Sequence, residues 1–182
     1  NDIERDRAHP TKKHRRPLAS GTISAHQAQF LMGGLFALLM LGWLVVPKPM
    51  LVIMVYVALN IAYTYYLKHQ PVLDIFTIAS GFVLRVYAGA VALTVPVSGW
   101  MFVSTFCLAL YLAAIKRRQE LEQSGADGRA VLEKYSVSLV DKYAEMSAVG
   151  ALVFYSMFVM SAKPGLILTV PIVLFGLFRY WY

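Results

Sequence analysis

The chain of 182 residues is 58% hydrophobic and only 15% charged, whereas a soluble domain carries about 25% charged residues. This composition excludes an ordinary soluble domain and predicts an all-α protein that crosses a membrane several times as a polytopic helical bundle. We attribute the net charge of +7 to basic residues at one membrane face, and we expect no nucleic acid as a partner.

The first segment, residues 1–24, is polar and holds both signs of charge at high density. Three carboxylates, those of Asp2, Glu4 and Asp6, lie beside six Lys and Arg residues. Mg²⁺ takes oxygen ligands and completes its shell with water and substrate phosphate, while Lys and Arg bind phosphate directly. The segment therefore suits a Mg²⁺–diphosphate site, but it also suits a solvated loop whose acids balance its bases, which is the commoner case in membrane proteins.

Six apolar stretches follow, and each is about long enough to cross a bilayer core of roughly 30 Å as a helix. They cover residues 26–46, 50–67, 73–94, 99–115, 144–162 and 165–182. Proline and glycine fall between them, where turns are expected. Ser24 with Gln27, and Ser138 with Asp141, have the pattern of a capping box at the start of the first and fifth helices.

The basic residues fall almost entirely on one side of the predicted membrane. If each stretch crosses once, the side that holds residues 1–24 also holds fourteen Lys and Arg, and the other side holds only Lys48 and Lys163. The positive-inside rule makes the basic side cytoplasmic. We therefore expect an inner (plasma) membrane protein whose active site faces the cytoplasm, with long loops at 1–24 and 116–143.

Two charged residues interrupt the third apolar stretch. Asp74 and Arg85 are eleven residues apart, which places them on one helix face about 16 Å apart along the axis. A guanidinium at that depth faces the bundle interior or a cavity, so Arg85 either pairs with an acid or a backbone carbonyl or lines an active chamber. Asn60, Tyr63 and Tyr66 mark one side of the second stretch, and Asn60 is expected to bond a neighbouring helix.

The fourth stretch ends in the sequence KRRQE at residues 116–120. This pattern is typical of a basic belt at the membrane surface with a Lys116–Glu120 pair, which stabilises a helix by only a few tenths of a kcal/mol. It equally suits a motif that binds phosphate. Asp141 is explained either as a capping residue or as a contact to a metal ion or a ribose.

Taken together, these motifs resemble those of the UbiA-type prenyltransferase superfamily, and most closely its decaprenyl-phosphate phosphoribosyltransferase branch. The first segment is similar to the family pattern NDxxDxxxD followed by DRxHPxKxxRPxxxG. The sequences GFVLRVYAGA (81–90), KRRQEL (116–121) and VLEKYS (131–136) fit that branch in the same order. The resemblance implies a single transmembrane catalytic domain over residues 1–182, with one or two further spans upstream.

One feature departs from the family pattern. Asn1 and Asp6 are only five residues apart, so the motif is three residues shorter than the family's and lacks its middle Asp. We expect that three residues are missing from the sequence between Ile3 and Glu4, rather than that the protein has lost a metal ligand.

The resemblance also implies an activity and a set of site residues. The implied reaction transfers 5-phosphoribose from phosphoribosyl diphosphate to a long polyprenyl (decaprenyl) phosphate, releases pyrophosphate and makes a precursor of cell-wall arabinan. The expected partners are these two substrates, the bilayer and further copies of the chain in a homo-oligomer. The implied cofactor is Mg²⁺, held by Asp2, Glu4 and Asp6, and the expected catalytic residues are Asp2, Asp6, Lys12 and Arg16. The expected substrate-binding residues are Asn1, Arg7, Tyr63, Lys68, Arg85, Lys116, Arg117, Arg118, Glu120 and Asp141.

Two other functions remain open at the level of sequence. An aromatic prenyltransferase of the same superfamily would use a polyprenyl diphosphate donor, but such members carry a second Asp-rich motif where this chain has the basic sequence 116–121. A lipid-phosphate or anion transporter would show repeats with broken spans, and no convincing internal repeat is visible.

Overall fold

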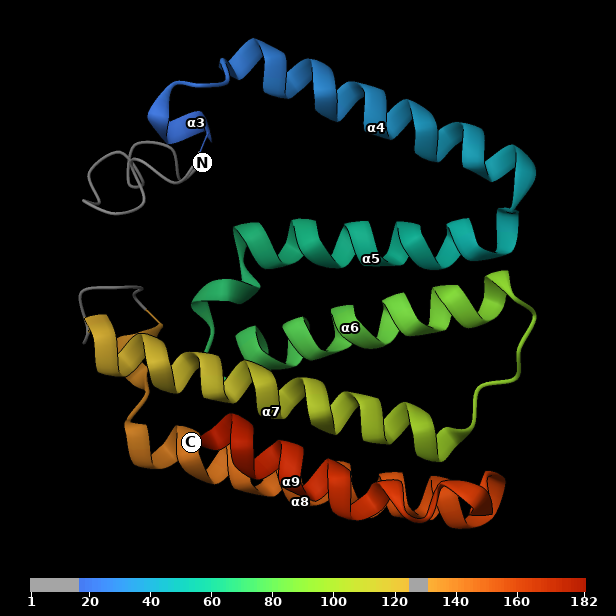
Figure 1. Ribbon diagram of the computed structural model, residues 1–182. Helices are drawn as coiled ribbons and strands as arrows, with labels where there is room; N and C mark the ends of the chain where they lie inside the picture. The colour runs from blue at the N-terminus through green and yellow to red at the C-terminus, as the bar shows by residue number, and fades with distance from the viewer. Residues whose placement is uncertain (1–16, 125–130) are drawn as a thin grey trace. The chain divides into compact units, whose positions relative to one another are not determined.

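The computed structural model describes residues 17–124 and 131–182, and within these ranges the chain forms helices and no strand (Figure 1). The all-α prediction is therefore confirmed. The chain divides into two compact parts, residues 1–47 and 48–182. The α-helices are α3 (Pro17–Ser20), α4 (Ala25–Val45), α5 (Pro47–Tyr65), α6 (Leu73–Ala92), α7 (Gly99–Ser124), α8 (Val137–Ala162) and α9 (Thr169–Trp181), and the short 3₁₀ helices are η1 (Leu67–His69), η3 (Leu132–Lys134) and η4 (Pro164–Leu166).

In the described part of the chain, five helices, α4 to α8, are long and apolar enough to cross a membrane. The protein is therefore a multi-pass membrane protein. The stretch 165–182 differs from the prediction because its helix α9 begins only at Thr169 and has 13 residues, fewer than the roughly 20 that a bilayer requires. The preceding residues are taken up by η4, which Pro164 opens.

The first part contains the capping box that the sequence predicts. The Ser24 hydroxyl accepts a hydrogen bond from the Gln27 N–H at 3.2 Å, and Gln27 Oε1 accepts one from the Ser24 N–H at 2.9 Å. These bonds satisfy two donors that the first turn of α4 would otherwise leave unpaired.

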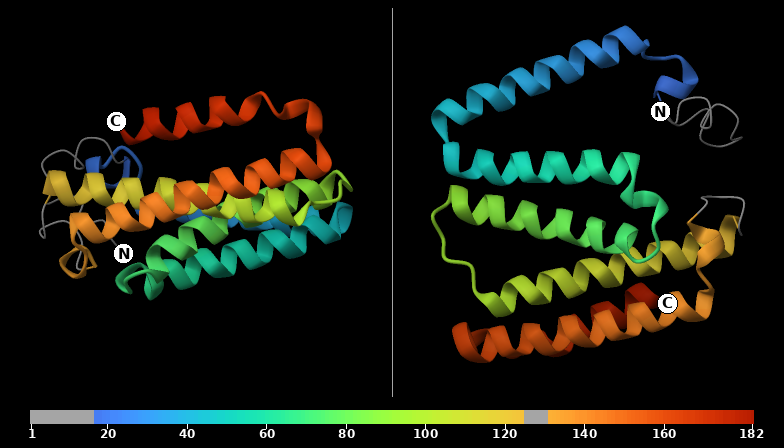
Figure 2. Two further views of the ribbon diagram at one scale, coloured as in Figure 1. Left: turned by 90° about the horizontal axis from the view of Figure 1, so that it is seen from below. Right: turned by 180° about the vertical axis from the view of Figure 1, so that it is seen from behind.

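In the second part, α5, α6, α7 and α8 lie side by side, and successive helices run in opposite directions (Figures 1 and 2). Helix α9 packs against α7, where the Tyr111 hydroxyl donates to the Leu177 carbonyl at 2.6 Å and its ring stacks on Trp181. The buried core of this part consists of Ile75, Tyr111, Ala113, Ala114, Ile115, Val131, Tyr135, Val140, Ala144 and Leu177.

Helices α7 and α8 approach closely because small residues line their contact. A Cβ atom added to Gly150 would lie 3.0 Å from Cys107 Sγ, and the Ser104 hydroxyl donates to the Ala151 carbonyl at 3.1 Å. Small residues and short polar side chains of this kind are the usual means of joining helices in a membrane.

Both helices extend into the segment 116–143, which was expected to be a loop. Helix α7 continues to Ser124, and α8 begins at Val137. The predicted capping box at Ser138 is wrong, because Ser136 is the N-cap and its hydroxyl accepts from the Leu139 N–H at 3.2 Å. The Ser136 carbonyl already accepts a helical hydrogen bond from Val140, so the first turn starts two residues earlier.

Candidate functional site

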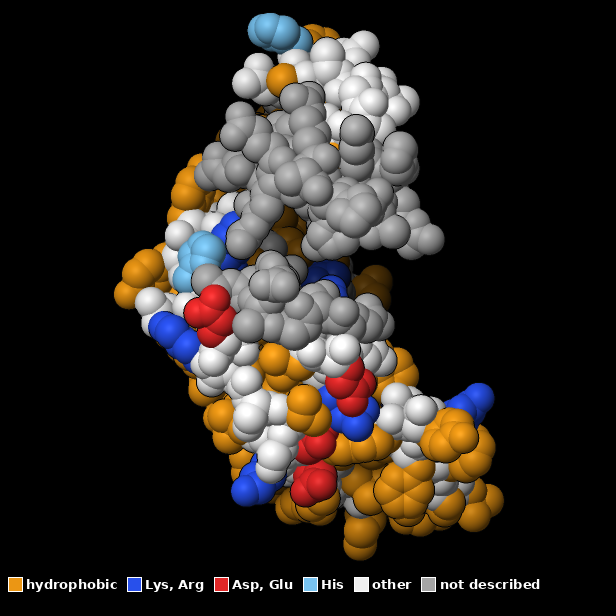
Figure 3. Space-filling model, turned by 90° about the vertical axis from the view of Figure 1, so that its left-hand side faces the viewer, with side chains coloured by type: hydrophobic (Ala, Val, Ile, Leu, Met, Phe, Trp, Pro, Cys, Tyr) orange, Lys and Arg blue, Asp and Glu red, His pale blue; other side chains and the backbone are white. Residues whose placement is uncertain are grey.

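One end of the second part carries most of its charged side chains, and we call it the charged end. It is formed where α5 ends, α6 begins, α7 ends and α8 begins, so that residues far apart in sequence meet there. Figure 3 views this end and shows Lys, Arg, Asp and Glu side chains gathered over it. Lys48 and Lys163 belong to the opposite helix ends, which agrees with the predicted alternation of the spans.

A buried ion pair lies at the centre of the charged end. Arg117 Nε lies 2.7 Å from Asp74 Oδ2, and the two side chains are 1% and 0% exposed. The other oxygen, Asp74 Oδ1, accepts a hydrogen bond from the Tyr135 hydroxyl at 2.7 Å. Asp74 also lies in the first turn of α6, where the positive end of the helix dipole stabilises a carboxylate. The cost of burying both charges is thus offset by direct pairing and hydrogen bonds.

The same guanidinium joins two further side chains. Arg117 Nη1 donates to Glu120 Oε2 at 2.6 Å, and Nη2 donates to the Tyr63 hydroxyl at 3.3 Å. Arg117 therefore connects α5, α6 and α7 instead of lying at the surface. Of the basic triplet, Lys116 is exposed and Arg118 is half-buried, so these two are the members that solvent and a ligand reach.

The sequence predicts a substrate-binding role for Arg117 and places Asp74 in the third apolar stretch, but it does not predict that the two residues pair. The available signal is that ionisable residues in membrane segments usually pair with one another. Asp74 and Arg117 are 43 residues apart, and only the packing of α6 against α7 shows that they are the two partners.

Tyr135, to which the sequence analysis assigned no role, completes this network. Its hydroxyl donates to Asp74 and accepts from the Val72 N–H at 2.6 Å. Burial and the hydrogen bond to Asp74 raise the pKa of the Tyr135 phenol, so it remains a donor at physiological pH. Val72 has a φ of 66°, a left-handed conformation that costs a β-branched residue on the order of 1–3 kcal/mol.

Replacing Tyr135 by phenylalanine removes one donor and one acceptor from this network. We expect Tyr135→Phe to lower the free energy of unfolding by about 1–3 kcal/mol, because Asp74 and the Val72 N–H each lose a partner. Since the folded-state pKa lies above the ordinary value of about 10, the contribution is constant near neutral pH and falls as the pH rises above about 10. Thermal unfolding in detergent measures both effects.

The matched control for this variant is Tyr66→Phe, because Tyr66 is 63% exposed and should tolerate the change. Equal unfolding temperatures for the two variants would contradict the role assigned to Tyr135.

A second ion pair joins α7 to α8 at the charged end. Arg118 Nε lies 2.8 Å from Asp141 Oδ1, and Arg118 Nη2 lies 3.2 Å from Glu122 Oε1. The first contact is close, but its atoms are not aligned as a hydrogen bond. Asp141 is therefore an ion-pair partner of Arg118 and not a helix-capping residue, and its role toward a metal or ribose stays a prediction.

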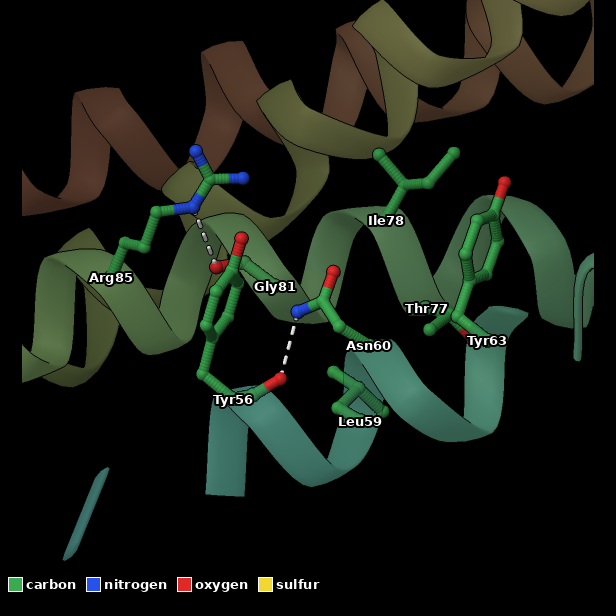
Figure 4. Close-up of a pocket in the computed structure, with 8 residues that line it drawn as sticks. All are labelled: Tyr56, Leu59, Asn60, Tyr63, Thr77, Ile78, Gly81 and Arg85. Atoms are coloured by element: carbon green, nitrogen blue, oxygen red, sulfur yellow. Dashed lines mark hydrogen bonds between the residues drawn. The ribbon is translucent and has the colours of Figure 1, made fainter. Parts of the chain in front are cut away.

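A pocket of about 90 Å³, the α5–α6 pocket, lies between these two helices (Figure 4). Figure 4 shows Tyr56, Asn60 and Tyr63 pointing from α5 toward α6, as their spacing of four and three residues on one helix face requires. Asn60 Nδ2 donates to the Tyr56 carbonyl of its own helix at 2.7 Å, so the expected bond to a neighbouring helix is wrong. The lining residues are Tyr56, Leu59, Asn60, Tyr63, Thr77, Ile78, Gly81 and Arg85.

Arg85 bonds a backbone carbonyl, which is one of the alternatives that its sequence position left open, while its role in an active chamber stays a prediction. Its Nε donates to the Gly81 carbonyl at 3.3 Å, and its guanidinium lies over the rings of Phe82 and Tyr56, at 4.5 and 5.3 Å from their centroids. It also lines the α5–α6 pocket. Tyr66, in contrast, lies beyond the end of α5 and does not line the pocket.

The predicted metal ligands and several predicted substrate contacts lie outside the described residues. These are Asn1, Asp2, Glu4, Asp6, Arg7, Lys12 and Arg16. Within residues 17–124 and 131–182, no group of three His, Cys, Asp or Glu side chains could hold a metal ion. Lys68 lies half-buried in η1 at the charged end.

The multi-pass helical fold and the polar end of its second part agree with the family to which the sequence assigns this chain. The whole chain, residues 1–182, matches the model of the UbiA prenyltransferase family, and the protein belongs to that family.

Among its curated relatives, the chain is 40% identical to the decaprenyl-phosphate phosphoribosyltransferase of Mycolicibacterium smegmatis, over 88% of this chain and 51% of the relative. It is 36% identical to the protein of the same name from Corynebacterium glutamicum, over 86% of this chain and 48% of the relative. It is 31% identical to nodulation protein NoeC of Azorhizobium caulinodans, over 87% and 53%. The chain therefore spans about half the length of these relatives.

Proposed function

We propose that the protein is a transferase that moves 5-phosphoribose from phosphoribosyl diphosphate to a long polyprenyl phosphate, such as decaprenyl phosphate. The observation that carries the proposal is the similarity to decaprenyl-phosphate phosphoribosyltransferases, at 36–40% identity over 86–88% of this chain. The charged end supports it, because both substrates are anionic and the donor carries several phosphates.

The basic residues divide into two roles in this proposal. Lys116 and Arg118 contact substrate phosphate, together with Lys68 and the residues Lys12 and Arg16 of the first segment. Arg117 instead acts as a positioning residue, because its guanidinium is buried against Asp74 and Glu120. The basic triplet thus supplies ligand contacts from its two more accessible members and holds α7 in place through the buried one.

Mg²⁺ is the proposed cofactor, with Asp2, Glu4 and Asp6 as its ligands. Of the described acids at the charged end, Asp74 is buried against Arg117, which leaves the metal to the first segment, with Asp141 as a further candidate contact to the ion or the ribose. When bound, the ion neutralises charge on the departing pyrophosphate, and Lys12 and Arg16 share that charge.

The proposed reaction is a direct displacement at the ribose C1. An oxygen of the lipid phosphate forms a bond to C1 while the bond from C1 to the pyrophosphate oxygen breaks, and pyrophosphate leaves with the bonding electron pair. C1 has oxocarbenium character in the transition state, as in other glycosyl transfers. Because the attacking oxygen is already anionic, no general base is needed, and attack opposite the leaving group inverts C1.

We place this reaction at the cytoplasmic face of the inner membrane, because the charged end holds the excess of basic residues that marks that face. The product would serve as a precursor of cell-wall arabinan.

The test compares two pairs of substrates on the purified full-length protein in detergent with Mg²⁺. Labelled phosphoribosyl diphosphate with decaprenyl phosphate should give a labelled lipid and pyrophosphate. Prenylation of an aromatic acid by a polyprenyl diphosphate, without ribosyl transfer, would instead assign the protein to the aromatic prenyltransferases. Product formed in detergent needs no gradient, so it would also exclude a transporter.

A further inference from the structure

Arg85 places a positive charge about halfway across the predicted membrane. It follows Asp74 by eleven residues in α6, or about 16 Å along the helix axis, in a hydrocarbon core of roughly 30 Å. A charged side chain is costly at this depth, and it normally faces a partner or a cavity that has a function.

Within residues 17–124 and 131–182, Arg85 forms no ion pair with a carboxylate. Within the described part of the chain, the guanidinium makes one hydrogen bond, from Nε to Gly81, and otherwise lies over two aromatic rings. Its two terminal nitrogens are therefore available to an anionic ligand.

The α5–α6 pocket provides the space and the chemistry for such a ligand. Its volume of about 90 Å³ is several times what one water molecule requires. Asn60 uses one amide N–H on the Tyr56 carbonyl and retains a second, while Leu59 and Ile78 form apolar walls. A guanidinium beside amide and phenol groups suits the oxygens of a phosphate, to which Arg donates two parallel hydrogen bonds.

The depth of the pocket indicates a lipid rather than a water-soluble anion. A phosphate with a polyprenyl tail arrives from within the bilayer, whereas a soluble diphosphate finds its cations at the charged end. The two regions meet at Tyr63, whose side chain lines the pocket while its hydroxyl lies 3.3 Å from Arg117 Nη2.

We propose that Arg85 binds the phosphate of the polyprenyl phosphate acceptor in the α5–α6 pocket. The identity of this lipid rests on the proposed function, while the anionic subsite itself rests on the position and contacts of Arg85.

Steady-state kinetics of the full-length protein tests the subsite. In Arg85→Gln, the KM for decaprenyl phosphate should rise about tenfold or more, as expected for losing hydrogen bonds to a charged group. The KM for phosphoribosyl diphosphate should stay within about twofold, because the donor binds elsewhere. Arg85→Lys keeps the positive charge but cannot donate two parallel hydrogen bonds to one phosphate. Its KM for the lipid should therefore lie between those of the unchanged protein and of Arg85→Gln.

The matched control is Arg179→Gln. Arg179 also places its guanidinium over an aromatic ring, 5.9 Å from the centroid of Tyr182, but it does not line the pocket. Its kinetics should equal those of the unchanged protein. An unchanged KM for the lipid in Arg85→Gln, or an equal rise for both substrates, would overturn the proposal. If Arg85→Gln does not fold, Arg85→Lys carries the same comparison.

Binding without turnover separates this proposal from the proposed function. Decaprenyl phosphate should raise the unfolding temperature of the unchanged protein, while decaprenol and inorganic phosphate at equal concentration should not, and Arg85→Gln should lose the shift. Arg85-dependent lipid binding without ribosyl transfer would leave the subsite standing and remove the function. Stabilisation by inorganic phosphate through Arg85 would overturn the assignment of the subsite to a lipid, and an undiminished lipid shift in Arg85→Gln would remove the subsite.

Discussion

Replacing Asp74 by alanine is expected to lower the free energy of unfolding by about 3–5 kcal/mol, the usual effect of breaking a buried ion pair from one side. Arg117 would remain charged and 1% exposed, and it would have lost its carboxylate partner on α6. Tyr135 would lose its acceptor at the same time. Thermal unfolding of the full-length protein in detergent should show the largest shift of any single change at the charged end.

Two further variants show whether the ion pair itself is responsible. Glu122→Gln removes the partner of a pair whose side chains are 28% and 47% exposed, and it should cost only about 0–1 kcal/mol. The double variant Asp74→Ala with Arg117→Met should unfold at a higher temperature than Asp74→Ala alone, because the guanidinium that has lost its α6 carboxylate is then no longer buried. If Asp74→Ala and Glu122→Gln unfolded at the same temperature, the central role of the pair would be refuted.

If the proposed function is correct, removing Mg²⁺ with a chelator is expected to abolish the proposed ribosyl transfer by the full-length protein, and added Mg²⁺ should restore it. Asp6→Asn should lower kcat/KM by at least about 100-fold, because the metal stabilises transition-state charge by several kcal/mol. It should also raise the Mg²⁺ concentration that gives half-maximal rate. Initial rates measured across a Mg²⁺ titration give both quantities.

The control for the metal prediction is Glu133→Gln, since Glu133 is an exposed acid of η3 that has no proposed role in the site. It should leave the titration unchanged. Full activity after complete chelation, or an unchanged rate in Asp6→Asn, would show that the acids of the first segment do not hold a catalytic metal.

Sequence alone predicted the helical spans well in their apolar parts and less well at their polar ends. Hydropathy marks where a chain lies in lipid, and it does not mark where a helix stops. Helix α7 continues to Ser124 because the residues KRRQELEQ favour helix even outside lipid. The short α9 shows the opposite case, because η4 and the turn after it take up the first residues of an apolar stretch.

The candidate site was predictable as a set of residue types at one end, but not as a network. The depth of Arg85 and the basic residues at 116–118 follow from spacing along single helices. The bonds of Arg117 to Asp74, Glu120 and Tyr63 depend on how three helices pack, and no spacing within one helix reveals that packing. Tyr135 belongs to the VLEKYS stretch that fits the family, but that likeness assigns it no role, and only the folded structure shows its hydrogen bond to Asp74.

The left-handed conformation of Val72 lies at the end of the short connection between α5 and α6. This connection is fastened just before it by Tyr63, which bonds Arg117, and just after it by Val72, whose N–H is held by Tyr135. Lys68 therefore lies in a short connection whose two ends are both held by side-chain hydrogen bonds. The backbone of this connection has already lost much conformational entropy during folding, so binding of a ligand to Lys68 should cost less additional entropy.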